Sequence, residues 1–132
     1  MCAVELDGKT EQVGCDLERI GRLRLDLAER FFCREEYEAV LMRETEEERR
    51  DCFFRYWVLK ESFIKATGRG MALPLNSFSI RLGEPPVLRS QPEEYPCRYY
   101  YREFSVRDIS YKMAVCSTDE EIDSEIHMGL RL

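Results

Sequence analysis

The stretch YWVLKESFIKATGRG, residues 56–70, has the apolar spacing of a helix that packs into a core. At 100° per residue, the apolar side chains in it and just before it share one stripe, made of Phe54, Trp57, Val58 and Ile64. Glu61 falls in the middle of that stripe. A carboxylate placed there must be paired with a cation, protonated or bound to a metal, because burying an unpaired charge costs free energy. The stretch therefore predicts a core helix that carries a polar site.

Bulk composition predicts one ordinary globular domain over residues 1–132. Hydrophobic residues make up 44% of the chain and charged residues 35%, which favours neither disorder nor a membrane class. No apolar run is long enough to cross a bilayer, and the first residues lack the pattern of a signal peptide. We therefore expect a cytoplasmic protein without a membrane partner.

Charge and cysteine usage narrow the class of partner. The net charge of -6 argues against general nucleic-acid binding, which needs a basic face. A local basic stretch is either a landing site for an acidic partner or a solvated helix face, and it contains Arg19, Arg22, Arg24, Arg30 and Arg34. The six cysteines form no C-x-x-C pair, so we expect them to be reduced and mostly buried. His127 is the single histidine, which excludes a multi-histidine metal site.

Hydrophobic periodicity predicts an α+β fold. Strands are expected at 2–6 and 11–18, joined by a turn at Asp7-Gly8, and later at 77–82, 97–108 and 111–118. Helices are expected at 23–32, 34–42 and about 46–67, the last ended by Gly68. The proline-rich segment 83–96 is expected to be a connection. This order of elements predicts an antiparallel β-sheet packed against a long helix.

Two further acids accompany Glu61. Side chains alternate between the faces of a strand, so Asp16 and Glu18 in VGCDLE share one face. Alone, such a pair is commonplace on the wet face of an amphipathic strand. With Glu61 it forms the oxygen-rich, partial ligand set that Mg²⁺ accepts while keeping positions for water and phosphate.

Two lysines complete the candidate site. Lys65 lies one turn beyond Glu61 on the same helix face, and Lys60 is adjacent to Glu61 in sequence. Acids that hold a metal beside lysines that hold phosphate are a reasonable ensemble for phosphoryl transfer. A structural Glu61–Lys65 pair at i, i+4 is the alternative interpretation, and the spacing does not decide between them.

Two separated motifs carry a family resemblance. VGCDLE at 13–18 and WVLKESFIK at 57–65 resemble the paired G-x-D-x-E and W-x-x-K-E-[SA]-x-x-K signature of the 4′-phosphopantetheinyl transferase superfamily. Further segments are similar to the C-terminal half of its surfactin-synthetase-activating, Sfp-like type, at residues 28–37, 71–82 and 111–116. The resemblance covers nearly the whole chain.

The resemblance implies a reaction and a role for each motif residue. The reaction moves 4′-phosphopantetheine from coenzyme A to a serine of an apo acyl or peptidyl carrier protein and releases 3′,5′-ADP. It implies that Asp16, Glu18 and Glu61 bind Mg²⁺, or Mn²⁺ in its place, and that Glu61 also serves as a base. Lys65 would stabilise the leaving phosphate, and Lys60 would contact the phosphates of coenzyme A.

Members of the Sfp-like type consist of two similar halves, and this chain resembles only the C-terminal half. Single-half members trimerise, so we expect a homo-oligomer, dimer or trimer, with the coenzyme site near the subunit interface. One alternative is a non-catalytic fragment or relative that binds coenzyme A and metal and needs a missing N-terminal half. Another is a cytosolic structural protein with a fortuitous acid cluster.

Overall fold

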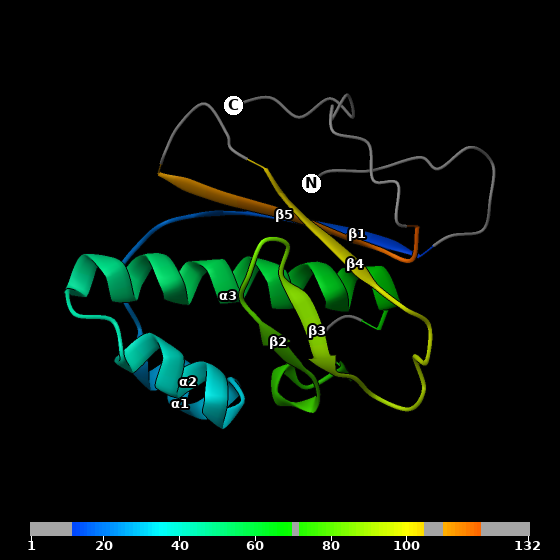
Figure 1. The fold of residues 1–132 in the computed structure, drawn as a ribbon, viewed down its shortest axis with the longest axis horizontal. Coiled ribbons are helices and arrows are strands. Elements are labelled where there is room, and N and C mark those ends of the chain that lie inside the picture. Colours follow the sequence, from blue (N-terminus) through cyan, green and yellow to red (C-terminus); the bar gives the residue numbers. More distant parts are fainter. Residues whose placement is uncertain (1–11, 70–71, 105–109, 120–132) are drawn as a thin grey trace.

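The computed structural model describes residues 12–69, 72–104 and 110–119 (Figure 1). Along the chain the elements are β1 (Val13–Arg19), α1 (Leu25–Phe31), α2 (Arg34–Leu41), α3 (Glu46–Thr67), the short 3₁₀ helix η2 (Leu75–Ser77), β2 (Ser79–Arg81), β3 (Val87–Ser90), β4 (Tyr100–Phe104) and β5 (Tyr111–Ser117). The α+β architecture and the antiparallel pairing confirm the predicted fold class.

The long helix α3 is defined by signals at both ends. At its start Thr45 Oγ1 accepts a hydrogen bond from the Glu48 amide at 3.0 Å, and Glu48 Oε1 accepts one from the Thr45 amide at 3.2 Å. This reciprocal capping box satisfies amides that no helical carbonyl can reach. At its end Gly68 adopts a φ of 74°, a left-handed conformation that glycine takes without a steric penalty. The predicted boundaries of this helix are confirmed.

α3 lies between two layers of the fold (Figure 1). One layer is the antiparallel sheet in the order β1-β5-β4. The other is made of α1, α2 and the two-stranded ribbon β2-β3. Because both layers contact α3, its buried residues cover most of its circumference, with Phe53, Val58, Leu59, Phe63 and Ile64 in the core. The stripe that carries Glu61 and Lys65 is left partly exposed.

The sheet has two different faces. Gly14 pairs with Cys116 and Asp16 pairs with Ala114, and both partners belong to the core cluster around α3. On the opposite face Cys15, Met113 and Val115 form a second, smaller apolar cluster. The alternation along β1 therefore points Gly14, Asp16 and Glu18 toward α3, as the sequence predicted for the two acids.

The structure also differs from the sequence predictions. The segment 83–96 is not only a connection, because it contains β3, which pairs with β2. Cys33, Cys52, Cys97 and Cys116 are free, but Cys15 is disulfide-bonded, so the prediction of reduced cysteines was wrong for Cys15. Its side chain belongs to the face of the sheet turned away from α3, outside the main core. The strand predicted at 2–6 and the Asp7-Gly8 turn lie outside the described residues.

None of the helices within the described ranges combines the length and the apolar character that a bilayer crossing requires.

The contact between β1 and α3 at Gly14 yields a stability prediction. A Cβ at Gly14 would lie 2.2 Å from the Ser62 carbonyl oxygen and 2.3 Å from the Ala66 amide nitrogen. Because both atoms belong to backbone, Gly14→Ala must push strand and helix apart, and we expect a loss of about 3 kcal/mol in the free energy of unfolding. Urea denaturation followed by circular dichroism measures it.

Gly21→Ala is the matched control. Its added Cβ would meet only Phe54 Cζ, at the ordinary contact distance of 3.8 Å. The two variants make the same chemical change. Equal stabilities of the two variants would contradict the close approach at Gly14.

Candidate functional site

The predicted acids meet where β1 crosses the C-terminal half of α3. Lys65 Nζ donates a hydrogen bond to Asp16 Oδ1 at 2.6 Å. The Asp16 side chain is 3% exposed, whereas that of Lys65 is 49% exposed. Glu18 and Glu61 are half-buried, and their charges act on this pair. The cluster of Asp16, Glu18, Glu61 and Lys65, called the acid cluster below, thus lies at the edge of the core.

Negative charge in the acid cluster exceeds what its one lysine can neutralise. Burial raises the pKa of Glu18 to about 7, helped by the charge of Asp16, a hydrogen bond to Asp16 and the charge of Glu61, and opposed by Lys65. Burial, followed by the charge of Asp16, also raises the pKa of Glu61, again against Lys65. Three carboxylates so close together favour a proton or a cation between them.

The chemistry of these donors fits a hard cation, although no coordination shell is assembled. Asp16 Oδ2 is buried, and when Glu18 is ionised no described residue donates a hydrogen bond to it. A buried carboxylate oxygen without a donor is costly, and a divalent cation would satisfy it. In the described ranges, however, no three acidic, cysteine or histidine side chains are arranged to hold a metal ion. The Lys65 ammonium is the positive group that contacts Asp16 in this arrangement.

Lys60 does not lie where the resemblance implied. Its side chain is fully buried, and Nζ lies 3.0 Å from Glu36 Oε1. The ammonium also donates to the carbonyl oxygens of Leu75 and Phe78, both at 2.6 Å. Burial lowers the pKa of Lys60, while the charge of Glu36 opposes that shift. With its donors facing the core, Lys60 is not positioned to contact a coenzyme phosphate, so this expected role does not fit the structure.

Sequence reasoning missed Glu36, the partner of Lys60. Glu36 is the third residue of α2, and its Oε1 accepts a hydrogen bond from the amide of Cys33, the residue before the helix, at 2.9 Å. A glutamate three residues after a helix-capping position was the available signal. That signal predicts a cap and gives no hint of a buried ion pair.

The basic stretch divides into paired and unpaired arginines. Arg24 pairs with Asp26 at 2.9 Å, and Arg34 pairs with Glu38 at 3.1 Å, as expected for a solvated helix face. Arg19 and Arg22 are exposed and form no ion pair with a described residue. Arg19 directly follows Glu18 in the chain, and Arg22 comes three residues later. Arg19 and Arg22 therefore keep the charge that an acidic partner would need.

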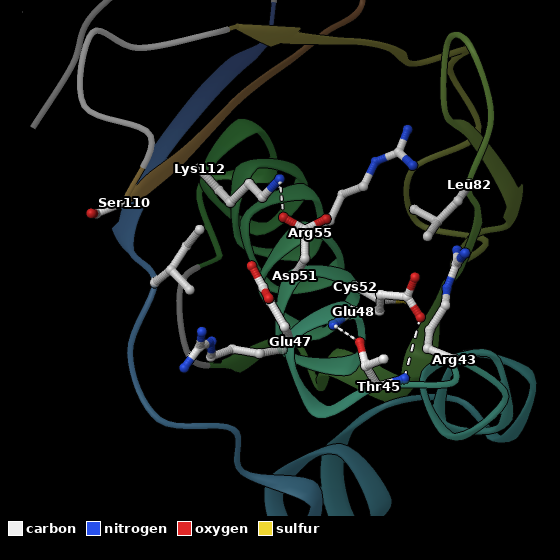
Figure 2. Close-up of a pocket in the computed structure, with 12 residues that line it drawn as sticks. Arg43, Thr45, Glu47, Glu48, Asp51, Cys52, Arg55, Leu82, Ser110 and Lys112 are labelled. Atoms are coloured by element: carbon white, nitrogen blue, oxygen red, sulfur yellow. Dashed lines mark hydrogen bonds and ion pairs between the residues drawn. The ribbon is translucent and has the colours of Figure 1, made fainter.

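A hollow of about 1070 Å³ lies beside the N-terminal half of α3, away from the acid cluster (Figure 2). Figure 2 shows Lys112 turned toward Asp51, and their ion pair measures 2.6 Å. Arg55 makes two hydrogen bonds of 2.7 Å to the carboxylate of Glu103. Lys112, Asp51 and Arg55 are thus already engaged in ion pairs, and none of the acid cluster lines this hollow.

Comparisons of the sequence with a family model and with known proteins identify the same family. The model of the 4′-phosphopantetheinyl transferase superfamily matches residues 12–116. The 4′-phosphopantetheinyl transferase Sfp of Bacillus subtilis strain 168 is 37% identical over 121 residues, which are 90% of this chain and 52% of that protein. The 4′-phosphopantetheinyl transferase psf-1 of Bacillus pumilus is 41% identical over 107 residues, 80% of this chain and 44% of that protein. The chain thus spans about half the length of these relatives.

Solved structures agree on the fold. The holo-[acyl-carrier-protein] synthase of Thermotoga maritima superposes with a TM-score of 0.65 at 23% identity, covering 80% of this chain and 61% of that one. A holo-(acyl-carrier-protein) synthase of Bacillus anthracis, solved in complex with CoA (3′,5′-ADP), gives a TM-score of 0.64 at 16% identity and covers 80% of this chain and 93% of that one. At these identities the likeness shows the shared fold alone.

The raised pKa of Glu18 predicts how stability depends on pH. The folded chain holds the Glu18 proton up to about pH 7, whereas an unperturbed glutamate has a pKa of 4.5. This contribution to stability is therefore fully present below pH 4.5 and is lost as pH rises through about 7. Without divalent cations we expect the Tm to fall between about pH 5 and 8, and to fall less in Glu18→Gln.

Thermal melts followed by circular dichroism across this pH range measure the effect. Glu46→Gln, at an exposed position in the first turn of α3, is the matched control and should keep the slope of the parent chain. A Glu18→Gln variant with the same slope as the parent would show that Glu18 ionises normally.

Proposed function

Because the chain belongs to the 4′-phosphopantetheinyl transferase superfamily, we propose that it serves Mg²⁺-dependent transfer of 4′-phosphopantetheine from coenzyme A to a serine of an apo acyl or peptidyl carrier protein, with release of 3′,5′-ADP. The observation that carries the proposal is the meeting of Asp16, Glu18, Glu61 and Lys65 at the edge of the core. Such a set serves a reaction in which phosphate charge must be held and a hydroxyl must lose its proton.

Asp16, Glu18 and Glu61 are the residues that would hold the metal. The unsatisfied Asp16 Oδ2 and the raised pKa values of the two glutamates support this assignment. Bound Mg²⁺, or Mn²⁺ in its place, offsets negative charge on a pyrophosphate. Hard oxygen ligands suit both ions, so the donor set does not select one of them.

Glu61 and Lys65 would handle the protons. In the proposed step, the serine oxygen of the carrier forms a bond to the phosphorus that bears the pantetheine group, and the bond from that phosphorus to 3′,5′-ADP breaks. The Glu61 carboxylate takes the serine proton, a role that its raised pKa favours. Lys65, half-exposed beside Asp16, donates a hydrogen bond to the leaving phosphate.

Arg19 and Arg22 are the proposed contact for the carrier protein. They are exposed and form no ion pair with a described residue, and they lie one and four residues after Glu18 in the chain. Positive side chains at this place would attract an acidic carrier surface and bring its serine to the acid cluster, even though the chain as a whole is negative.

The length of the chain allows two ways to complete the site. A second or third copy would supply the missing surface in a homo-oligomer, with coenzyme A bound near the interface. The alternative is a chain that binds coenzyme A and metal and transfers nothing unless an N-terminal half is present. This alternative is supported by the chain's match to only about half of the length of each relative.

Intact-mass measurement of the carrier tests the transfer. The chain is incubated with coenzyme A, Mg²⁺ and an apo carrier protein, and the phosphopantetheine adduct is followed over time. We expect adduct formation that slows at least about 100-fold in Glu61→Gln, because the base is lost. Glu46→Gln, the same change at an exposed position of α3, should match the parent.

The outcomes separate the two forms of the proposal. An adduct that forms equally fast in Glu61→Gln contradicts the role of the acid cluster. No adduct, under conditions where a two-half family member modifies the same carrier, favours the alternative of a chain that only binds.

Light scattering at micromolar concentration tests self-association. We expect the mass of a dimer or trimer of the 15.7 kDa chain. A monodisperse monomer that still forms the adduct would show that one copy is sufficient.

A further inference from the structure

Lys60 is the largest side chain that is fully buried in the described part of the fold. Its ammonium is surrounded by acceptors from three elements. Glu36 of α2 lies 3.0 Å away, and the carbonyl oxygens of Leu75 in η2 and Phe78 before β2 each accept a hydrogen bond of 2.6 Å. The Phe78 ring lies 4.1 Å from the ammonium. A buried ammonium with this many fixed partners holds the elements that provide them.

Glu36 completes the same network from the other side. Its Oε1 accepts a hydrogen bond from the Cys33 amide at 2.9 Å, and its Oε2 accepts one from the Ile80 amide at 2.8 Å. Both carboxylate oxygens therefore accept hydrogen bonds, and the Glu36 side chain is fully buried. The pair ties α2 and the start of β2 to one position on α3.

Lys60 and Glu61 are consecutive, so their side chains leave α3 about 100° apart. Lys60 points into the layer of α2 and β2, whereas Glu61 feels the charge of Asp16 on β1. Any roll of α3 about its axis that moved one of them would move the other. On the sheet side, the backbone contact of Gly14 with Ser62 and Ala66 limits translation of the helix toward β1.

We propose that Glu36 and Lys60 are a positioning pair that fixes the roll of α3, so that Glu61 faces Asp16 and Glu18. The proposal rests on the proposed function for the use of Glu61, but its geometry stands without it. It replaces the coenzyme contact that the sequence had implied for Lys60. Directional hydrogen bonds to three elements specify one orientation of the helix, which apolar packing specifies less sharply.

Trp57 provides a readout of that roll. It is the single tryptophan of the chain and lies on α3, one turn before Lys60. Its ring lies 6.4 Å from the ring of Phe32, which joins α1 to α2, with an angle of 39° between the ring planes. A changed roll of α3 therefore changes the near-ultraviolet circular dichroism and the fluorescence of Trp57, without coenzyme A, metal or carrier protein.

Three variants test the proposal. Lys60→Met leaves Glu36 buried without its cation, and we expect its Tm to fall by about 10 °C or more. Glu36→Leu combined with Lys60→Met removes both charges and should recover at least half of that fall. In this double variant the Trp57 spectrum should stay different from the parent's, because the bonds that fix the roll are gone. Lys112→Met, the same change at a lysine whose partner Asp51 is 56% exposed, should stay within about 3 °C of the parent and keep the parent spectrum.

Each outcome either supports or overturns the positioning role of Glu36 and Lys60. A Lys60→Met variant as stable as Lys112→Met overturns the buried pair, and so does a double variant that regains no stability. A double variant that regains its Tm together with the parent Trp57 spectrum shows that the pair adds stability only, which overturns the positioning role. If Lys60→Met fails to fold, the double variant still gives both readings. None of these results depends on transfer activity, so a failed transfer assay is a separate finding.

Discussion

The close approach of β1 to α3 at Gly14 is the constraint on which the rest of the structure depends. A side chain larger than hydrogen would enter the backbone of Ser62 and Ala66, so strand and helix meet without an intervening layer of side chains. Strand alternation then places Asp16 and Glu18 on the same face as Gly14. The carboxylates reach Glu61 and Lys65 because the backbones have already come together.

This arrangement brings three carboxylates and one lysine together near the C-terminal end of α3, so the carboxylates repel one another. One lysine contacts Asp16, while the pKa values of Glu18 and Glu61 both rise. A protein selected for stability alone would place apolar side chains here, and local rules of this kind are broken mainly at functional sites. A different side of α3, about 100° round the helix from Glu61, carries a fully satisfied pair, Glu36 and Lys60. The side of the helix with Lys60 thus holds neighbouring elements in place, whereas the acid cluster keeps excess negative charge.

The sequence predicted the features that depend on local periodicity. The bounds of α3, its end at Gly68 and the shared face of Asp16 and Glu18 follow from spacing and from the chemistry of glycine. Strand β3 escaped prediction because the prolines around it suppress the strand signal, although a short edge ribbon tolerates them. Lys60 was misplaced for a different reason. Motif spacing gives the neighbours of a residue along the helix, whereas its partner Glu36 comes from another helix.

Binding of Mn²⁺ to the chain, followed by electron paramagnetic resonance, tests most directly whether the acid cluster is a metal site. The account predicts one bound ion per chain, with an affinity that falls at least about tenfold in Asp16→Asn because that variant removes a buried charged ligand. Glu46→Gln, which changes an exposed carboxylate of α3, should bind as the parent does. Equal affinities of the parent chain and Asp16→Asn, or no binding by the parent, would contradict the account.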